Sequence, residues 1–228
     1  DEREIALRDG ERHVARLIRA TDTGVPETEN YALAIKRKGA LDGLALVPVS
    51  RERPGRGEVE IEVRASGMNF RDVLNALGMY PGEAGPLGSE CAGVVTATGE
   101  GVTGFAVGDE VLALSARSFG LFVVTDARLV ARIPQGLSFE QAATIPVAFL
   151  TAWYALHDLA KLQAGERVLV HAAAGGVGIA AVQVAQWIGA EVLGTASTAK
   201  WDVVRSLGVE VVADSRDVNF AETIRRAT

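Results

Sequence analysis

The stretch from Glu166 to Trp187 constrains the fold more than any other part of this chain of 228 residues. It opens with a short apolar run, Val168–His171, which predicts a buried strand. Small residues and glycines follow at once. Apolar residues then recur at helical spacing, at Ile179, Val182, Ala185 and Ile188. A strand, a glycine-rich turn and a helix in this order are the setting that a dinucleotide-binding site needs.

Glycines in this turn let the backbone bend tightly and approach the pyrophosphate of a dinucleotide. The N–H groups at the start of the helix then meet the negative charge. Against the pattern Gly-x-Gly-x-x-Gly, Ala173 stands in place of the first glycine, whereas Gly175 and Gly178 keep the second and third. The glycines alone would also fit a tight strand-to-helix turn without a ligand. The strand and helix expected on either side favour dinucleotide binding.

The end of the next expected strand, Glu191–Thr195, indicates which dinucleotide is bound. An enzyme that uses NAD carries an Asp or Glu there, about twenty residues past the glycines. Residues 195–200 read Thr-Ala-Ser-Thr-Ala-Lys and contain no carboxylate. Lys200 and the hydroxyls suit a 2′-phosphate, hence NADPH, and Arg216 would be a second cation. The alternatives are a solvated lysine at a helix start and a loop arginine, and for each residue alone the two interpretations weigh equally.

Composition and charge argue against several classes of function. The net charge of −6 argues against a nucleic-acid partner. No apolar run is long enough to cross a bilayer, so no membrane partner is expected. Cys91 is the only cysteine, which excludes a disulfide framework and favours a cytoplasmic location. One cysteine and the scattered His13, His157 and His171 do not form a metal site. We expect His171 to be a hydrogen-bonded core residue inside its strand.

The sequence pattern changes near Pro134. Before it, alternating runs such as Glu58–Arg64 and turn glycines predict a compact, mostly β domain. A short helix is expected over residues 69–77, with one face formed by Phe70, Val73, Leu74 and Leu77. After Pro134, helices alternate with strands near 168–171, 191–195 and 209–213, which predicts a parallel, doubly wound α/β sheet. We assign residues 1–133 to the β domain and residues 134–228 to the first half of a nucleotide-binding domain.

Only about three strands of the predicted parallel sheet fall within the chain, whereas a doubly wound sheet has more strands beyond the first one. The strand at Val168–His171 is therefore expected at an exposed edge. The chain also starts with Asp1 rather than Met. We expect the chain to be a piece of a longer polypeptide, with a Rossmann domain that is incomplete after Thr228, and we expect this piece alone to be inactive.

Four segments together carry a family resemblance. They begin at Asn69 (NFRDVLNALGMYPG), Gly85 (GPLGSECAGVV), Phe149 (FLTAWYAL) and Leu169 (LVHAAAGGVG). In combination they resemble the enoylreductase domain of modular type I polyketide synthases, in the zinc-independent, quinone-oxidoreductase-like branch of the medium-chain dehydrogenases/reductases. The resemblance covers nearly the whole chain. It implies a GroES-like β domain followed by a Rossmann domain, with NADPH in the cleft.

The resemblance also implies an activity and partners. The substrate would be a 2-enoyl thioester on acyl carrier protein, reduced during polyketide chain extension. Hydride would reach the β-carbon and a proton the α-carbon. The neighbours would be a ketoreductase and other domains of a multifunctional synthase, which implies a place in antibiotic biosynthesis.

Single residues receive roles by the same resemblance. The cofactor-binding set is Asn69, Thr151, Gly175, Gly176, Val177, Gly178, Ser197, Lys200 and Arg216. The turn residues 175–177 would hold the pyrophosphate. Ser197, Lys200 and Arg216 would hold the 2′-phosphate, and Asn69 and Thr151 would lie near the nicotinamide. Tyr80 matches a tyrosine proposed in some members as the donor of the α-carbon proton and linked to the configuration of α-methyl branches. A phenol can aim its proton at a developing carbanion. The alternative is a loop tyrosine with a hydrated hydroxyl.

Two other functions remain open at this point. A free-standing NADPH quinone or enone oxidoreductase would share the cofactor site but reduce a small diffusible acceptor. A non-catalytic scaffold module would keep the fold without the reaction. The family's other proposed proton donors, a lysine and an aspartate, fall beyond Thr228, which is why we expect no activity from this piece alone.

Overall fold

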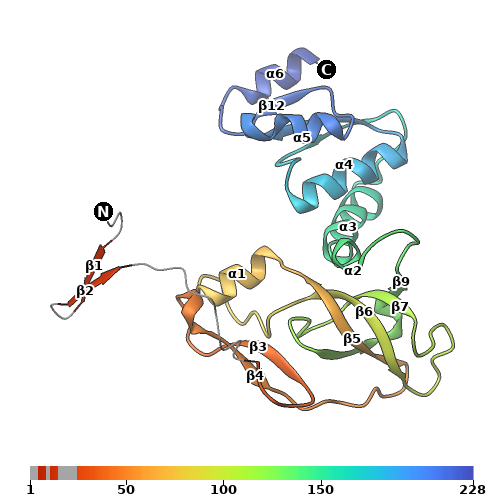
Figure 1. Ribbon diagram of the computed structural model, residues 1–228. Coiled ribbons are helices and arrows are strands. Elements are labelled where there is room, and N and C mark those ends of the chain that lie inside the picture. Colours follow the sequence, from red (N-terminus) through yellow and green to blue (C-terminus); the bar gives the residue numbers. More distant parts are fainter. Residues whose placement is uncertain (1–4, 9–10, 15–24, 228) are drawn as a thin grey trace.

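A computed structural model describes residues 5–8, 11–14 and 25–227, which form two lobes and a separate hairpin (Figure 1). One lobe is mostly β and comes from the first part of the chain. The other holds helices and a parallel sheet and comes from the last part. A GroES-like β unit followed by Rossmann-type α/β structure confirms the predicted fold class. Thr228 and the residues before Ile5 lie outside the described ranges.

A five-stranded antiparallel sheet forms the centre of the β lobe, in the order β8-β5-β6-β7-β9. Its strands are β5 (Glu58–Gly67), β6 (Glu90–Thr98), β7 (Glu110–Leu114), β8 (Phe122–Asp126) and β9 (Val130–Arg132). Alternate residues of β5, Val59 and Ile61, are fully buried and pack against Val95 and Val111. The predicted alternation over Glu58–Arg64 therefore describes the inward face of this strand.

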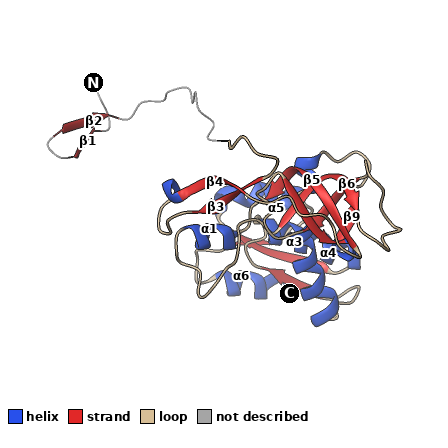
Figure 2. Cartoon of the chain, turned by 90° about the horizontal axis from the view of Figure 1, so that it is seen from below, coloured by secondary structure: helices blue, strands red, loops and turns tan. Residues whose placement is uncertain are grey.

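Two hairpins accompany this sheet. Strand β1 (Ile5–Arg8) pairs with β2 (Glu11–Val14), and β3 (Tyr31–Ile35) pairs with β4 (Leu44–Pro48), all antiparallel. A short 3-10 turn, η1 (Leu41–Gly43), leads into β4. Figure 2 shows β3 and β4 side by side along one margin of the β lobe.

Helix α1 (Phe70–Ala76) lies where the helical spacing predicts it, but its buried face is polar. Phe70 is 75% exposed, whereas Asp72 and Asn75 are buried. Asp72 Oδ1 accepts the N–H of Gly88 at 3.0 Å, and Asn75 Nδ2 donates to the carbonyl of Gly85 at 3.0 Å. These bonds fasten the loop over residues 85–88 to the helix, so its orientation follows polar contacts rather than the apolar face.

A 3-10 turn, η2 (Ala127–Leu129), joins β8 to β9 within the β lobe. The helices that connect the two lobes are α2 (Phe139–Ala142), α3 (Pro146–Trp153) and the π-helical turns η3 (Tyr154–Leu159). Ser138 caps α2 with a capping box: its Oγ accepts the N–H of Gln141 at 3.3 Å, and its N–H donates to Gln141 Oε1 at 2.9 Å. Helix α3 continues directly into η3.

Three parallel strands follow in the order β10-β11-β12, namely β10 (Arg167–Val170), β11 (Glu191–Ala196) and β12 (Val212–Asp214). They alternate with α4 (Gly176–Ile188), with the 3-10 turn η4 (Thr198–Lys200) and α5 (Trp201–Ser206), and then with α6 (Phe220–Ala227). This order confirms the predicted βαβ units. Among the described residues β10 lies at the edge of its sheet, as predicted.

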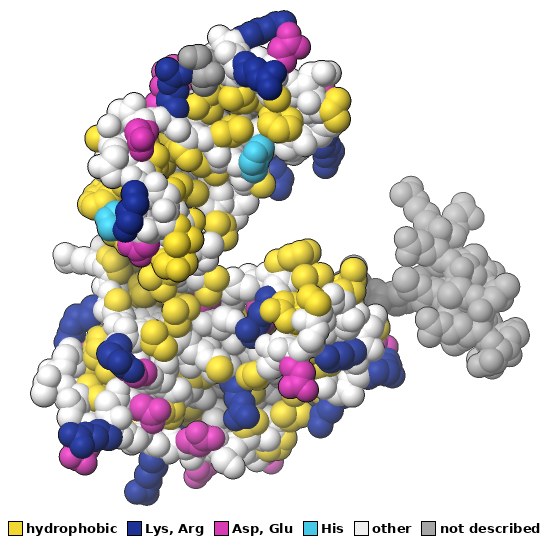
Figure 3. Space-filling view, turned by 180° about the vertical axis from the view of Figure 1, so that it is seen from behind, with side chains coloured by type: hydrophobic (Ala, Val, Ile, Leu, Met, Phe, Trp, Pro, Cys, Tyr) yellow, Lys and Arg dark blue, Asp and Glu magenta, His cyan; other side chains and the backbone are white. Residues whose placement is uncertain are grey.

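The core of this lobe lies between α4, α5 and the sheet. Val182 and Ala185 of α4 pack with Val192, Val204 and Val209. Helix α3 packs against α4 through Ala152, Ala180 and Val184. Figure 3 shows a hollow between the lobes, with hydrophobic side chains gathered along the neck that joins them. Within the described ranges, no helix combines the length and apolar character needed to cross a bilayer.

We predict that Cys91, on β6, is chemically inert in the folded protein. It is fully buried, and loss of hydration, with a smaller contribution from the charge of Glu90, raises the pKa of its thiol to about 12. Near pH 8 it should therefore be neutral as well as inaccessible. Timed labelling with a thiol reagent should show modification only after unfolding in urea. Labelling of the native protein at the rate of free cysteine would contradict this expectation.

Candidate functional site

The turn between β10 and α4 reverses the chain within five residues. Strand β10 ends at Val170, and Ala172 takes a left-handed φ of 50°. Gly175 is the N-cap of α4, and its N–H donates to the carbonyl of Ala172 at 2.8 Å. The helix therefore starts one short turn after the strand, as the glycine pattern predicts.

Gly178 is the residue that permits this close packing. A Cβ at this position would overlap the carbonyl oxygen of Ala172, whereas a Cβ at Gly176 would meet nothing within 4 Å. Gly175, Gly176 and Val177 are exposed. The N–H groups in the first turn of a helix have no partners inside it, and the helix dipole favours an anion there. The accessible start of α4 thus has the character of an anion site.

The segments that follow the three strands lie at one edge of the parallel sheet. The N–H of Ala173 donates to the carbonyl of Thr195 at 2.9 Å, and the N–H of Ser215 donates to that of Ala196 at 3.1 Å. These bonds tie each segment to the neighbouring strand. Ligands of doubly wound sheets bind outside the carboxyl ends of the strands. The predicted glycine turn, hydroxyl and cations therefore come to the edge where a dinucleotide would bind.

The polar residues of this edge carry positive charge. Ser197 directly follows β11 and is half-buried, while Lys200 and Arg216 are exposed. No carboxylate interrupts residues 196–200. Three acids lie nearby in the sequence: Asp202 is fully exposed, Asp214 Oδ1 accepts the N–H of Arg216 at 3.0 Å, and Asp217 Oδ1 accepts the N–H of Asn219 at 2.9 Å. The residues present fit a phosphate beside the ribose better than a pair of ribose hydroxyls.

His171 corrects one expectation. It lies just past the end of β10 and is exposed, so it is not a core residue inside the strand. Its Nδ1 lies 3.2 Å from Thr195 Oγ1, and its ring meets that of Phe220 edge-on at 5.4 Å. The expected hydrogen bond is present. The strand ends early because Ala172 donates its N–H to Thr195 Oγ1, at 3.3 Å, instead of extending the ladder.

The residues predicted near the nicotinamide come from the β lobe and from α3. Asn69 is the N-cap of α1, and its Nδ2 donates to Glu90 Oε1 at 2.9 Å. Thr151 is exposed on α3, and its Oγ1 donates to the carbonyl of Val147 at 2.6 Å. Tyr80 is half-buried in the loop after α1. The N–H of Tyr80 donates to the carbonyl of Leu74 at 3.2 Å, so this loop folds back onto α1.

Glu90 is a site residue that the sequence analysis missed. It is 4% exposed at the start of β6, and its two carboxylate oxygens accept hydrogen bonds from different elements. The available signal was a charged residue directly before the apolar run Cys91–Val95. A carboxylate is fully buried in a strand only when hydrogen bonds compensate for its lost hydration. Such a residue predicts partners elsewhere in the fold.

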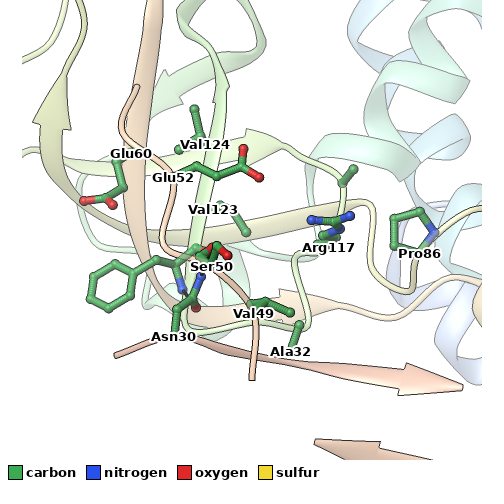
Figure 4. A pocket seen from close by; sticks show the side chains of 12 residues that line it. Asn30, Ala32, Val49, Ser50, Glu52, Glu60, Pro86, Arg117, Val123 and Val124 are labelled. Atoms are coloured by element: carbon green, nitrogen blue, oxygen red, sulfur yellow. Dashed lines mark hydrogen bonds between the residues drawn. The ribbon is translucent and has the colours of Figure 1, made fainter. Parts of the chain in front are cut away.

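Two pockets of the described part of the chain are lined by residues outside the sheet edge. Figure 4 shows one of about 320 Å³ within the β lobe, where Glu52 and Arg117 are among the lining side chains. Another, of about 460 Å³ and largely apolar, lies between β7, β9 and α3 and includes Phe149 and Trp153. Among the described residues, no three His, Cys, Asp or Glu side chains gather as a metal site.

Comparisons with known proteins agree with this geometry. Residues 55–152 match the family model of the alcohol dehydrogenase GroES-like domain. The polyketide synthase GfsB of Streptomyces halstedii is 51% identical over 243 residues, which span 97% of this chain and 4% of that protein. The chain therefore covers a small part of this curated relative.

Solved structures show the same fold. The CurK enoyl reductase is 46% identical, with a TM-score of 0.82 over 87% of this chain and 64% of that one. The mycobacterial protein Rv1454c, solved as a complex with NADPH, is 34% identical, with a TM-score of 0.76 over 86% of this chain and 63% of that one. Both solved chains extend beyond the matched region.

We predict that Gly178→Ala lowers the free energy of unfolding by about 1–3 kcal/mol, because the new methyl group would collide with the carbonyl of Ala172. Gly176→Ala is the matched control, since its methyl group meets open space. Urea unfolding should show a loss for the first variant and none for the second. Equal stability of the two variants would show that the close contact is unimportant.

Proposed function

This chain belongs to the medium-chain dehydrogenase/reductase superfamily, among the enoylreductase domains of polyketide synthases, and on that premise we propose that it is an NADPH-dependent enoyl reductase. Its substrate is the 2,3 double bond of an enoyl thioester carried on acyl carrier protein. The main support is the edge of the parallel sheet, where an accessible glycine turn lies beside Lys200 and Arg216 without an acid at the end of β11.

The cofactor-binding residues divide by the part of NADPH that each would hold. The pyrophosphate binds at the turn of residues 175–177, to the N–H groups of the first turn of α4, while the N–H of Gly175 stays bonded to Ala172. The Ser197 hydroxyl, Lys200 and Arg216 bind the 2′-phosphate. NADPH, when bound, supplies the hydride that reaches the β-carbon and leaves as NADP⁺. Asn69 and Thr151 hold the nicotinamide end, one from each side of the junction between the lobes.

The second half of the reaction is a proton transfer. Hydride addition to the β-carbon leaves a thioester enolate, and the Tyr80 phenol donates its proton to the α-carbon. Met68 precedes α1, Phe70 is its first residue and Met79 follows it, and they are 73%, 75% and 66% exposed. This apolar surface, close in sequence to Asn69 and Tyr80, suits the hydrocarbon part of an acyl chain.

The wider setting is also part of the proposal. Residues 1–133 form the substrate domain and residues 134–228 the first half of the NADPH-binding domain. Acyl carrier protein, a ketoreductase and other synthase domains are the partners in one multifunctional chain. The cytoplasm is the proposed location, since the single cysteine is a buried thiol.

The direct experiment supplies the full-length protein with NADPH and a crotonyl thioester. We expect NADPH absorbance to fall as the saturated thioester forms, with NADH much less effective. Oxidation only with a small quinone or enone would favour a quinone oxidoreductase. The absence of both turnover and an NADPH-dependent fluorescence change would favour a scaffold module.

We predict that Lys200→Ala and Arg216→Ala weaken the preference for NADPH over NADH. Each removes a cation from the proposed phosphate site, so KM for NADPH should rise by about tenfold while KM for NADH changes little. Lys36→Ala, an exposed lysine of the β lobe, is the control. Kinetics with both cofactors would test this, and an unchanged NADPH preference in both variants would remove these residues from the site.

A further inference from the structure

We propose that Glu90 is the positioning residue of the reductase site. Its carboxylate holds the Asn69 amide and the first turn of α3 in fixed relation and sets the orientation of that amide. The inference rests on the proposed function, because only that function places Asn69 and Thr151 beside a nicotinamide. It adds a residue that does not itself touch the cofactor.

The two oxygens of the Glu90 carboxylate serve different elements. Oε1 accepts from Asn69 Nδ2 at 2.9 Å, and Oε2 accepts from the backbone N–H of Val147 at 2.8 Å. Asn69 caps a helix of the β lobe, whereas Val147 lies in the first turn of the helix that packs on α4. One buried carboxylate therefore links the two lobes at the place where they join.

The link continues along α3 to Thr151. Pro146, the first residue of this helix, has no N–H, so Val147 provides the first free donor of the turn. A carboxylate at a helix N-terminus is also favoured by the dipole. Thr151 lies one turn further on, and its Oγ1 bonds to the carbonyl of the same Val147. The position of Thr151 thus depends on the residue that Glu90 holds.

The backbone around Glu90 leaves its side chain little freedom. Gly67 pairs with Glu90 across β5 and β6, and a Cβ on Gly67 would overlap the carboxylate. The Glu90 N–H donates to Ser118 Oγ at 3.1 Å, and Ser118 is fully buried. The carboxylate therefore lies across the glycine in one fixed place.

A carboxylate sets the orientation of Asn69 because it can only accept hydrogen bonds. The NH₂ group of Asn69 must face Glu90, which turns Oδ1 toward the first turn of α1, where the Asn69 side chain forms a capping box with Asp72. In Glu90→Gln the new amide must use its oxygen for Val147, since a backbone N–H cannot accept. Its NH₂ group would then face the NH₂ group of Asn69. The Asn69 amide would rotate to bring Oδ1 toward position 90, and its contact with the first turn of α1 in the capping box would be lost.

The test is a double-mutant cycle in the full-length protein. Its variants are Glu90→Gln, Asn69→Asp and the two combined, and Glu110→Gln, an exposed strand residue, is the control. NADPH affinity, urea midpoint and the single-turnover rate of hydride transfer to a crotonyl thioester are measured for each. Glu90→Gln should slow hydride transfer by about 10- to 100-fold, because a small misplacement at the reacting end is costly. Its NADPH affinity should change little, since the phosphates are held elsewhere.

The result that tests the proposal most sharply is the sign of the coupling between Glu90→Gln and Asn69→Asp. Asn69→Asp alone places two carboxylates in contact and should be slow. In the combined variant the new amide at position 90 can donate to the new carboxylate at position 69 while accepting from Val147, so its rate should exceed that of either single variant. A normal rate for Glu90→Gln, or a combined variant slower than both, would overturn the proposal. If the native protein transfers no hydride, the proposed function is wrong. The urea midpoints of the same variants then still show whether the side chains of residues 69 and 90 are paired.

Discussion

Helix α4 can begin directly after strand β10 because Gly178 allows it to approach the carbonyl oxygen of Ala172, where a side chain would collide. This contact sets the direction of the helix against the sheet. Val182 and Ala185 are then buried against the strands, and the first-turn N–H groups remain at the carboxyl edge of the sheet. The same close approach therefore determines both the core of this lobe and its anion site, so the site cannot be altered at Gly178 without disturbing the fold.

The junction of the lobes depends on buried polar groups as well as on apolar packing. Helix α3 packs on α4 through small apolar residues, and the start of α3 is bonded to the Glu90 carboxylate of the β sheet. Burying a carboxylate costs free energy unless donors replace the water that it loses. Glu90 meets this requirement with partners from both lobes, which gives the junction a defined geometry rather than a general apolar contact.

Sequence patterns predicted helices, strands and turns well where the pattern depends only on residues that are close together in the sequence. The alternating run Glu58–Arg64 and the strand-turn-helix around Gly175 lie where their spacing places them. The segments that carry Lys200 and Arg216, which the sequence analysis expects to hold one phosphate, follow neighbouring parallel strands that end at one edge. Residue spacing could not predict a hydrogen bond between a side chain and a backbone group that is distant in the sequence. Asp72 bonds 16 residues along the chain and Glu90 bonds 57 residues along it. For the same reason the buried face of α1 and the end of β10 at His171 were misjudged, since Thr195 lies on another strand.

The most direct measurement is an experimental structure of the full-length protein with NADP⁺. The pyrophosphate should lie against the N–H groups of Gly176 and Val177, the 2′-phosphate beside Lys200, and the nicotinamide between Asn69 and Thr151. A dinucleotide bound elsewhere, or a carboxylate against its adenosine ribose, would contradict the assignment of this edge as an NADPH site.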